Sequence, residues 1–346
     1  MCPILKLSIL STLLFFISNS KTFSQEKYNY TSKIDSLIKV IEPKFNGTIL
    51  ISKDGKTVYS KAQGFANFDK KTPLTMDSQF EIMSNTRQIT AVLILKEVEQ
   101  GRIDLQTPIK KYLPELKQTW ADTVTVHQLL NHTHGIVDMK KPLLFKPGTQ
   151  FKYGNMGYPL LGKIIEYSSK RSYSEIASLL FKSLKMNNTF CYSQDNNKNL
   201  VSGYINKNNS FEKAENSLIT SETVPSCGII STANDLAIWN NNLHKGRILK
   251  PKTYKSMLKY NILAQHPLFG KEKIGYGYGF RIVDQETQKY IGHTGLGDGF
   301  SSVNLYFPKN DVSFIAIENE MNANSELFYN AEIKIKNILL ESDLLN

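Results

Sequence analysis

The feature that most constrains the fold is the separation of two hydrophobic patterns along the chain. Strand-like alternation occurs around residues 46–63 and 275–318, whereas apolar residues at helical spacing fill residues 84–240. The strand-like segments are joined at Asp54-Gly55 and at residues 308–311, which are short polar connections typical of β-hairpins. Because hairpins make antiparallel neighbours, the sequence predicts one antiparallel sheet from both ends of the chain, with an inserted all-helical lobe.

These patterns predict an α+β fold in a single domain. The chain has 346 residues, enough to bury a large core without disulfide or metal support. We assign residues 25–346 to this domain. Within it, the sheet lobe is expected from residues 30–83 and 245–346, and the helical lobe from residues 84–244. A cleft between two such lobes is the natural place for a functional site.

The periodicity also predicts elements at the edges of these regions. Helical spacing is found at residues 32–43 and again at 323–340, while the Asn- and Ser-rich stretch 191–216 is typical of loops and turns. Cys191 and Cys227 follow the leader. Sequence cannot set the distance between them, so a disulfide stays open, but two free buried thiols are favoured.

The first 24 residues are typical of a cleaved secretory signal peptide. Lys6 precedes an apolar run from Leu7 to Ile17, and small residues near Ser24 suit a signal peptidase. This run is shorter than the roughly 20 apolar residues that a transmembrane helix needs, although an uncleaved anchor is the alternative. We therefore expect an exported protein, periplasmic or secreted, whose mature chain has no stable membrane insertion.

The basic charge of the chain is spread along it. The formal net charge is +11, but lysine and arginine occur as scattered pairs rather than in a block. A nucleic-acid-binding arm would concentrate them. The charge pattern therefore predicts a mildly cationic surface and no nucleic-acid partner. Separately, we expect a monomer whose partner is a small-molecule or peptide substrate.

Ser84 is the candidate nucleophile. It follows a short apolar entry that contains Phe80 and Ile82, and it precedes a long apolar helix that ends near Gly101. A residue three positions later lies one helical turn away on the same face, where it could activate the hydroxyl, and this residue is Arg87. The spacing alone is weak, because a serine at this place is more often a helix cap. Lysine follows at the same offset after Ser18, Ser36, Ser210 and Ser256.

The surroundings of Ser84 resemble those in the superfamily of serine β-lactamases, penicillin-binding proteins and related esterases. The resembling segments occur in the family's order over most of residues 46–318. They are SQFEIMSNTRQIT, PIKKYLP, VHQLLNHTHG, FKYGNMGYPLLGKIIE, CGIISTANDLAIW, GYGYGF and GHTGLGDGF. The resemblance implies the fold of class C β-lactamases and DD-peptidases, an antiparallel sheet flanked by helices with an inserted helical lobe.

The resemblance also implies roles for individual residues. Ser84 matches the nucleophile that forms an acyl-enzyme, and Tyr153 with Asn155 matches the second motif. His293, Thr294 and Gly295 match the third, substrate-binding motif. The backbone N–H groups of Ser84 and Leu296 match the oxyanion hole, which stabilises the developing negative charge.

The chain departs from the family at Arg87, where a lysine is expected. A buried lysine can lose its proton and act as a base, whereas arginine keeps its proton throughout. Arg87 can still donate hydrogen bonds to Ser84 and Tyr153. Tyr153, whose phenolate a fixed cation would stabilise, or His293 could accept the serine proton instead. The resemblance favours Tyr153, because tyrosine is thought to act as the base in some members of the family.

A rival motif contains His127, His132, His134 and Asp138. Two histidines two residues apart with a nearby carboxylate invite a zinc interpretation. The stretch ends at Gly135 after a helix, however, and the resembled family has a similar turn there without a metal. We favour a structural histidine turn, and we expect neither metal nor cofactor.

The sequence thus predicts an exported serine hydrolase that cleaves an ester or amide. A D-amino-acid peptide or a β-lactam would fit the resemblance. The alternative is a catalytically impaired binding protein of the cell envelope, in which Arg87 grips a carboxylate.

Overall fold

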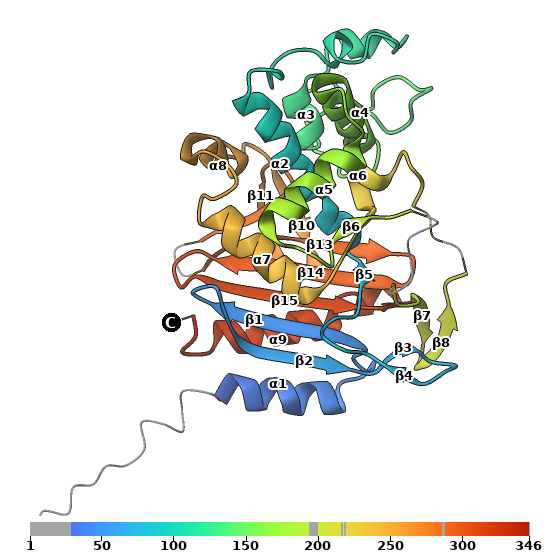
Figure 1. Ribbon diagram of the computed structural model, residues 1–346, viewed down its shortest axis with the longest axis vertical. Helices are drawn as coiled ribbons and strands as arrows, with labels where there is room; N and C mark the ends of the chain where they lie inside the picture. The colour runs from blue at the N-terminus through green and yellow to red at the C-terminus, as the bar shows by residue number, and fades with distance from the viewer. Residues whose placement is uncertain (1–28, 194–199, 216, 218, 286–287, 346) are drawn as a thin grey trace, which may run out of the picture.

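Both ends of the chain contribute strands to one central sheet. The computed structural model describes residues 29–193, 200–215, 217, 219–285 and 288–345, so the predicted signal peptide lies outside it. In the described residues the sheet has eight strands, in the order β10-β11-β12-β13-β14-β15-β1-β2, and neighbouring strands are antiparallel (Figure 1). The strands are β1 (Gly47–Lys53), β2 (Lys56–Gln63), β10 (Leu263–His266), β11 (Gly270–Tyr276), β12 (Arg281–Asp284), β13 (Lys289–Gly297), β14 (Phe300–Phe307) and β15 (Val312–Glu318). The predicted α+β fold and the sheet built from both chain ends are confirmed.

Two hairpins set the register of this sheet. Asp54 and Gly55 both adopt positive φ, at 53° and 73°, which suits the tight turn between β1 and β2. Side chains of β15 alternate between the two faces, because successive residues of a strand point in opposite directions. Ile315 and Ile317 enter the core beneath the helical lobe, whereas Phe314 enters the core on the other face.

Helices cover both faces of the sheet. α1 (Asn29–Val40) and α9 (Asn330–Leu340) pack together on one face, and α7 (Ala233–His244) packs on the other, against β1 and β15 (Figure 1). The remaining helices are α2 (Thr86–Glu99), α3 (Val126–Leu130), α4 (Gly157–Ser169), α5 (Tyr173–Leu184), α6 (Val224–Cys227) and α8 (Pro251–Met257). The 3₁₀ helices are η1 (Met83–Asn85), η2 (Ile109–Lys111), η3 (Thr119–Asp122), η4 (Pro267–Phe269) and η5 (Ser325–Leu327). Among the described helices, none is both long and apolar enough to cross a membrane.

Two local predictions need correction. The stretch expected to be loops contains a hairpin, whose polar strands meet at Asn208 and Asn209 in the left-handed conformation, with φ of 56° and 66°. The last helix begins at Asn330, later than predicted, because Phe328 is extended and Tyr329 has φ of 60°.

The remaining strands of the described chain are short and lie outside the central sheet. They are β3 (Phe65–Asn67), β4 (Thr72–Pro73), β5 (Phe80–Glu81), β6 (Phe190–Cys191), β7 (Tyr204–Lys207), β8 (Ser210–Lys213), β9 (Ile229–Ser231) and β16 (Glu320–Asn322).

The two cysteines of the described chain are free thiols. Cys191 is buried, and Cys227 is half-buried. Burial raises the pKa of the Cys191 thiol to about 12, so it stays protonated and unreactive at neutral pH.

Candidate active site

Ser84 lies in η1, which leads directly into α2. Its side chain is half-buried, and the preceding Met83 has φ of 49°, a strained value for a residue other than glycine. Asn85 Nδ2 donates to Ser302 Oγ at 2.8 Å, and Ser302 Oγ donates to Ile82 O at 2.7 Å. These bonds fix η1 to β14, so the candidate nucleophile is held against the sheet. Backbone strain beside a nucleophile is a common feature of active sites.

The third motif lies directly beneath η1. A Cβ atom on Gly295 would come within 2.2 Å of Ile82 O, so only glycine allows η1 to approach β13 this closely. β12 pairs with β13 only as far as Gly292. Among the described strands, residues 293–297 therefore pair with β14 alone and form an edge, to which an extended peptide can pair.

His293 is a neutral, already bonded side chain. Burial and the positive charges of Arg281 and Arg87 hold its pKa well below the usual range. The ring atom Nδ1 lies 2.7 Å from Thr294 O, and a carbonyl can only accept, so Nδ1 carries the proton. Nε2 then accepts from the Tyr276 hydroxyl at 3.0 Å. Because this lone pair is occupied, His293 is a poor candidate for the base.

Arg87 is buried and faces the second motif. Its Nη2 donates to Asn155 Oδ1 at 2.6 Å and to Gly154 O at 3.3 Å, and its Cζ lies 4.3 Å from the centre of the Tyr153 ring. In the part of the chain that the structure describes, Arg87 makes no hydrogen bond to Ser84 or to the Tyr153 hydroxyl. The expectation that it could donate to both is therefore not realised, because the long side chain extends past Ser84 to the turn before α4.

Tyr153 lies close to two buried guanidinium groups. Its ring centre is 4.3 Å from Arg87 Cζ and 5.2 Å from Arg281 Cζ, and 6.0 Å from the centre of the His293 ring. The structure thus brings Arg87, Tyr153, Asn155 and His293 together, with Ser84 one helical turn before Arg87. Arg281, the first residue of β12, was not identified from the sequence. Its signal is a charged residue within an otherwise apolar stretch, FRIV, at residues 280–283.

Neither guanidinium has an acidic partner within the described residues. Nε and Nη1 of Arg87 and Nε of Arg281 are buried without a hydrogen-bond acceptor. Burial lowers the pKa of both side chains, although an arginine remains protonated near neutral pH. Burying two neighbouring cations without acidic partners destabilises the folded state unless a ligand or a reaction supplies negative charge.

The histidine motif forms a wall of the site and is not fully bonded. The His132 ring lies 4.6 Å from the Tyr153 ring and 5.1 Å from the Tyr276 ring, and neither of its nitrogens has a partner. Burial and the nearby Arg87 lower the pKa of His132 well below its usual value, which keeps the ring neutral. His127 instead bonds the Tyr278 hydroxyl at 2.6 Å.

These side chains do not form a metal centre in the described chain. No group of three or more His, Cys, Asp or Glu side chains there is arranged to hold a metal ion. The last member of the motif, Asp138, accepts from the backbone N–H of Lys140 at 2.8 Å, in a local turn.

Comparison with known proteins identifies similar chains. A model of the Beta-lactamase family matches residues 42–335. Over 300 residues the chain is 29% identical to Protein flp of Staphylococcus aureus (strain MRSA252), a match that covers 79% of this chain and 59% of that protein. The chain therefore spans less than two thirds of the length of this relative.

Solved structures with a similar fold include two penicillin-binding proteins. The octameric penicillin-binding protein homologue from Pyrococcus abyssi aligns with a TM-score of 0.77 and 29% identity, over 89% of this chain and 76% of that chain. The penicillin-binding protein from Bacillus halodurans aligns with a TM-score of 0.75 and 23% identity, over 90% of this chain and 99% of that chain.

Proposed function

Because this chain belongs to the Beta-lactamase family, a family of the serine hydrolase and acyl-transferase kind, we propose that it hydrolyses an ester or amide through an acyl-enzyme on Ser84. The observation that carries the proposal is the position of Tyr153 close to the guanidinium groups of both Arg87 and Arg281. Two fixed cations favour the phenolate form of the tyrosine, which can take the place of the missing lysine as the proton acceptor.

The proposed reaction has two stages. Ser84 Oγ attacks the substrate carbonyl carbon while its proton passes to the Tyr153 phenolate, and the tetrahedral intermediate expels the alcohol or amine, which takes that proton back. Water then attacks the acyl carbon and gives a proton to Tyr153. The second tetrahedral intermediate breaks its bond to Ser84 Oγ, which takes that proton back from Tyr153, and the acid is released. The backbone N–H groups of Ser84 and Leu296 are proposed to stabilise the oxyanion in both stages.

The proposed substrate carries a negative charge close to the reacting carbonyl. This follows from the two guanidinium groups, which have unused donors and no carboxylate partner in the described residues. Arginine pairs well with carboxylates because its planar donors match their two oxygens. A peptide that ends in a free carboxylate and a β-lactam acid both meet this description.

Intact-mass spectrometry after exposure to benzylpenicillin and to a nitrophenyl ester tests the proposal. We expect an added acyl mass that is absent from Ser84→Ala, together with ester turnover by the parent. An adduct that persists in Ser84→Ala would exclude this serine as the nucleophile.

A non-catalytic binding protein is the second candidate, favoured by one observation. Arg87 is held by Asn155 as a permanent cation and cannot itself accept a proton. This candidate predicts no adduct and no turnover, but it predicts saturable binding of a carboxylate ligand that is weakened in Arg281→Gln.

Export and assembly belong to the proposal as well. We propose that the chain acts outside the cytoplasm, as a monomer, after loss of its leader. The similar protein from Pyrococcus abyssi is described as octameric, so light scattering of the mature chain is the direct test of assembly.

A further inference from the structure

A second cavity lies in the helical lobe, away from the candidate active site. Its volume is about 520 Å³, and it is lined by the C-terminal part of α2, the end of α4 and one face of α5. Pockets of roughly 300–1,000 Å³ are typical of small-molecule sites. We refer to it as the α2–α4–α5 cavity.

The cavity and the candidate active site lie at opposite ends of the same two helices. At the first turn of α2, Arg87 donates to Gly154 and Asn155, just before α4. Near the other end, Ser168 Oγ on α4 donates to Glu97 Oε2 on α2 at 3.0 Å. The two helices therefore run parallel, and Glu97 is roughly 15 Å along α2 from Arg87, at 1.5 Å per residue.

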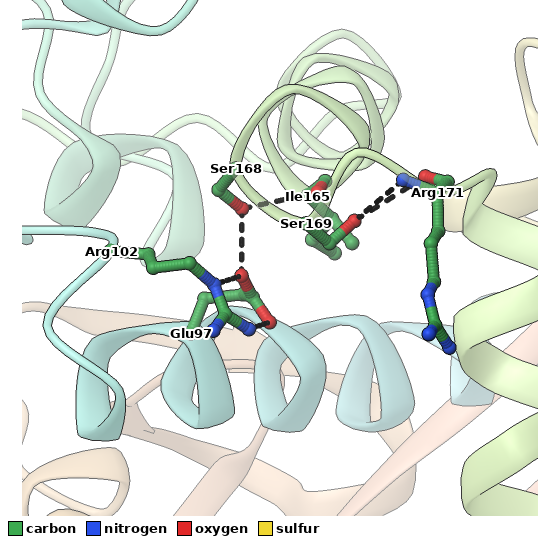
Figure 2. A network of polar contacts seen from close by, with 6 residues as sticks. All are labelled: Glu97, Arg102, Ile165, Ser168, Ser169 and Arg171. Atoms are coloured by element: carbon green, nitrogen blue, oxygen red, sulfur yellow. Dashed lines mark hydrogen bonds and ion pairs between the residues drawn. The ribbon is translucent and has the colours of Figure 1, made fainter.

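The only acidic side chain that lines the cavity, within the described residues, is already neutralised. Glu97 is 4% exposed and receives two hydrogen bonds of 2.6 Å from Arg102, in a bidentate pair, in addition to the bond from Ser168 (Figure 2). A bidentate arginine–carboxylate pair of this kind is strong and specific. The carboxylate therefore does not cancel the other positive charges of the lining.

Two further cationic side chains line the cavity, and acidic partners offset little of their charge. Lys96 forms no ion pair in the described chain, and it comes from α2. Arg171 also lines the cavity, and in Figure 2 it lies beyond Ser169 as seen from Glu97. Its partner Glu175 is 3.6 Å away with both side chains 53% exposed, and exposed pairs of this kind contribute little. The cavity therefore favours a negatively charged ligand.

The rest of the wall contains apolar side chains as well as the polar side chains of Gln100, Ser168, Ser169 and Ser183. Leu93 of α2 faces the cavity together with Ile176 and Leu179 of α5. Leu179 is 48% exposed, and apolar surface of this kind gains free energy when a ligand removes it from water. A ligand that matches both parts of the wall needs an anionic head and an apolar body.

We propose that the α2–α4–α5 cavity is a binding site for a small amphiphilic anion, a carboxylate or a phosphate monoester attached to an apolar chain. Lys96 and Arg171 would bind the head, and Leu93, Ile176 and Leu179 would cover the body. Nothing in this proposal depends on turnover at Ser84.

Titration calorimetry with decanoate and with octyl phosphate, each below its micelle concentration, tests the site. We expect one saturable site per chain, and the ratio of the two affinities identifies the preferred head group. Acetate and inorganic phosphate, which lack the body, should bind at least tenfold more weakly. Decyltrimethylammonium, which has the body but the opposite charge, should not bind.

Matched variants locate the site. The double variant Lys96→Gln/Arg171→Gln should weaken binding at least tenfold, and Leu179→Ser should weaken decanoate more than acetate. Lys163→Gln/Lys182→Gln removes the same charge from exposed positions on α4 and α5 that do not line the cavity, and it should bind as the parent does.

Two results would overturn the proposal. One is equal affinity in the two double variants, which would show that the cavity is not the binding place. The other is loss of binding in Arg281→Gln, which would place the amphiphile in the candidate active site instead. Thermal unfolding of every variant confirms that it is folded before binding is compared.

Discussion

Asn155 accepts a 2.6 Å hydrogen bond from Arg87, and this contact joins the turn before α4 to the first turn of α2. In the family resemblance, a lysine would occupy the position of Arg87 and exchange protons. Here the side chain is a fixed cation that holds Asn155 and faces the ring of Tyr153. In the proposed mechanism, proton transfer therefore falls to the phenol of Tyr153.

Removal of the Tyr153 hydroxyl should abolish most turnover. We expect Tyr153→Phe to lower kcat by about 10²–10⁴-fold, the usual contribution of a general base, with little change in KM. Tyr167→Phe, on the exposed side of α4, is the matched control and should behave as the parent. Steady-state hydrolysis of a chromogenic ester measures both, and parent-like activity of Tyr153→Phe would exclude the phenol as the base.

Arg87→Lys should reduce the rate and not restore it. The shorter side chain loses the contact that Nη2 makes with Asn155, and a buried lysine that loses its proton leaves Tyr153 without its nearer cation. We expect kcat/KM to fall about tenfold, which corresponds to about 1.4 kcal/mol of transition-state stabilisation. A clear gain in rate would instead mark the natural chain as a disabled member of its family.

Arg281→Gln should discriminate between charged and neutral substrates. Because its guanidinium is proposed to meet the substrate anion, kcat/KM for a carboxylate-bearing ester should fall about tenfold more than for a neutral ester, mainly through KM. The same variant should raise the melting temperature, since it removes a buried charge that lacks an acidic partner in the described chain. An equal loss for both esters would contradict the anion-binding role.

Gly295→Ala should separate η1 from β13. The new Cβ would lie 2.2 Å from Ile82 O, in a place where the backbone itself has to move. We expect a loss of activity of 10²-fold or more, because a displacement of about 1 Å at a catalytic group has this effect. Gly246→Ala is a control at a glycine with open space around it, although its φ of 70° makes some destabilisation expected there too.

Stability should fall as the pH rises from about 6.5 to 8. Burial and the nearby Asp298 raise the pKa of the Glu81 carboxyl to about 8, so the folded chain retains a proton that the unfolded chain, with a value near 4.5, has lost. The stabilisation that Glu81 provides through this proton is complete at low pH and disappears as the pH passes through 8. Between pH 6.5 and 8 the resulting loss of stability is at most about 2 kcal/mol.

Buried histidines change the stability with pH in the opposite direction, but in a lower pH range. Burial lowers the pKa of His134 to about 4, which reduces stability only below its unfolded value near 6.5. Melting temperatures of the parent and of Glu81→Gln, measured from pH 6.5 to 8, isolate the carboxyl. A slope that persists unchanged in Glu81→Gln would assign the effect to other groups.

Much of the fold could be predicted from the sequence, because strand alternation and hairpin turns are local signals. The β14–β15 connection and the turn at Asp54-Gly55 are examples. The β7–β8 hairpin was missed because its strands are short and polar, and β7 is stabilised by pairing with the distant β16. No local pattern can reveal such a partner.

The candidate site was only partly predictable for a similar reason. Ser84, Tyr153 and His293 occur in recognisable local motifs. Arg281 and His132 become part of the site because β12 and the turn after α3 converge on Tyr153, and this convergence depends on the complete fold. The cationic lining of the α2–α4–α5 cavity is likewise assembled from helices far apart in the sequence.

The strand pairing of the central sheet determines the order in which parts of the protein can fold. β1 is made well before β15, the strand with which it pairs. Asn85 must likewise wait for Ser302, 217 positions later, before η1 is anchored. Contacts this distant in sequence slow folding and leave strand edges exposed meanwhile. A chain that lacks β14 and β15 therefore cannot hold Ser84 in place, so the proposed hydrolysis requires both strands to be paired.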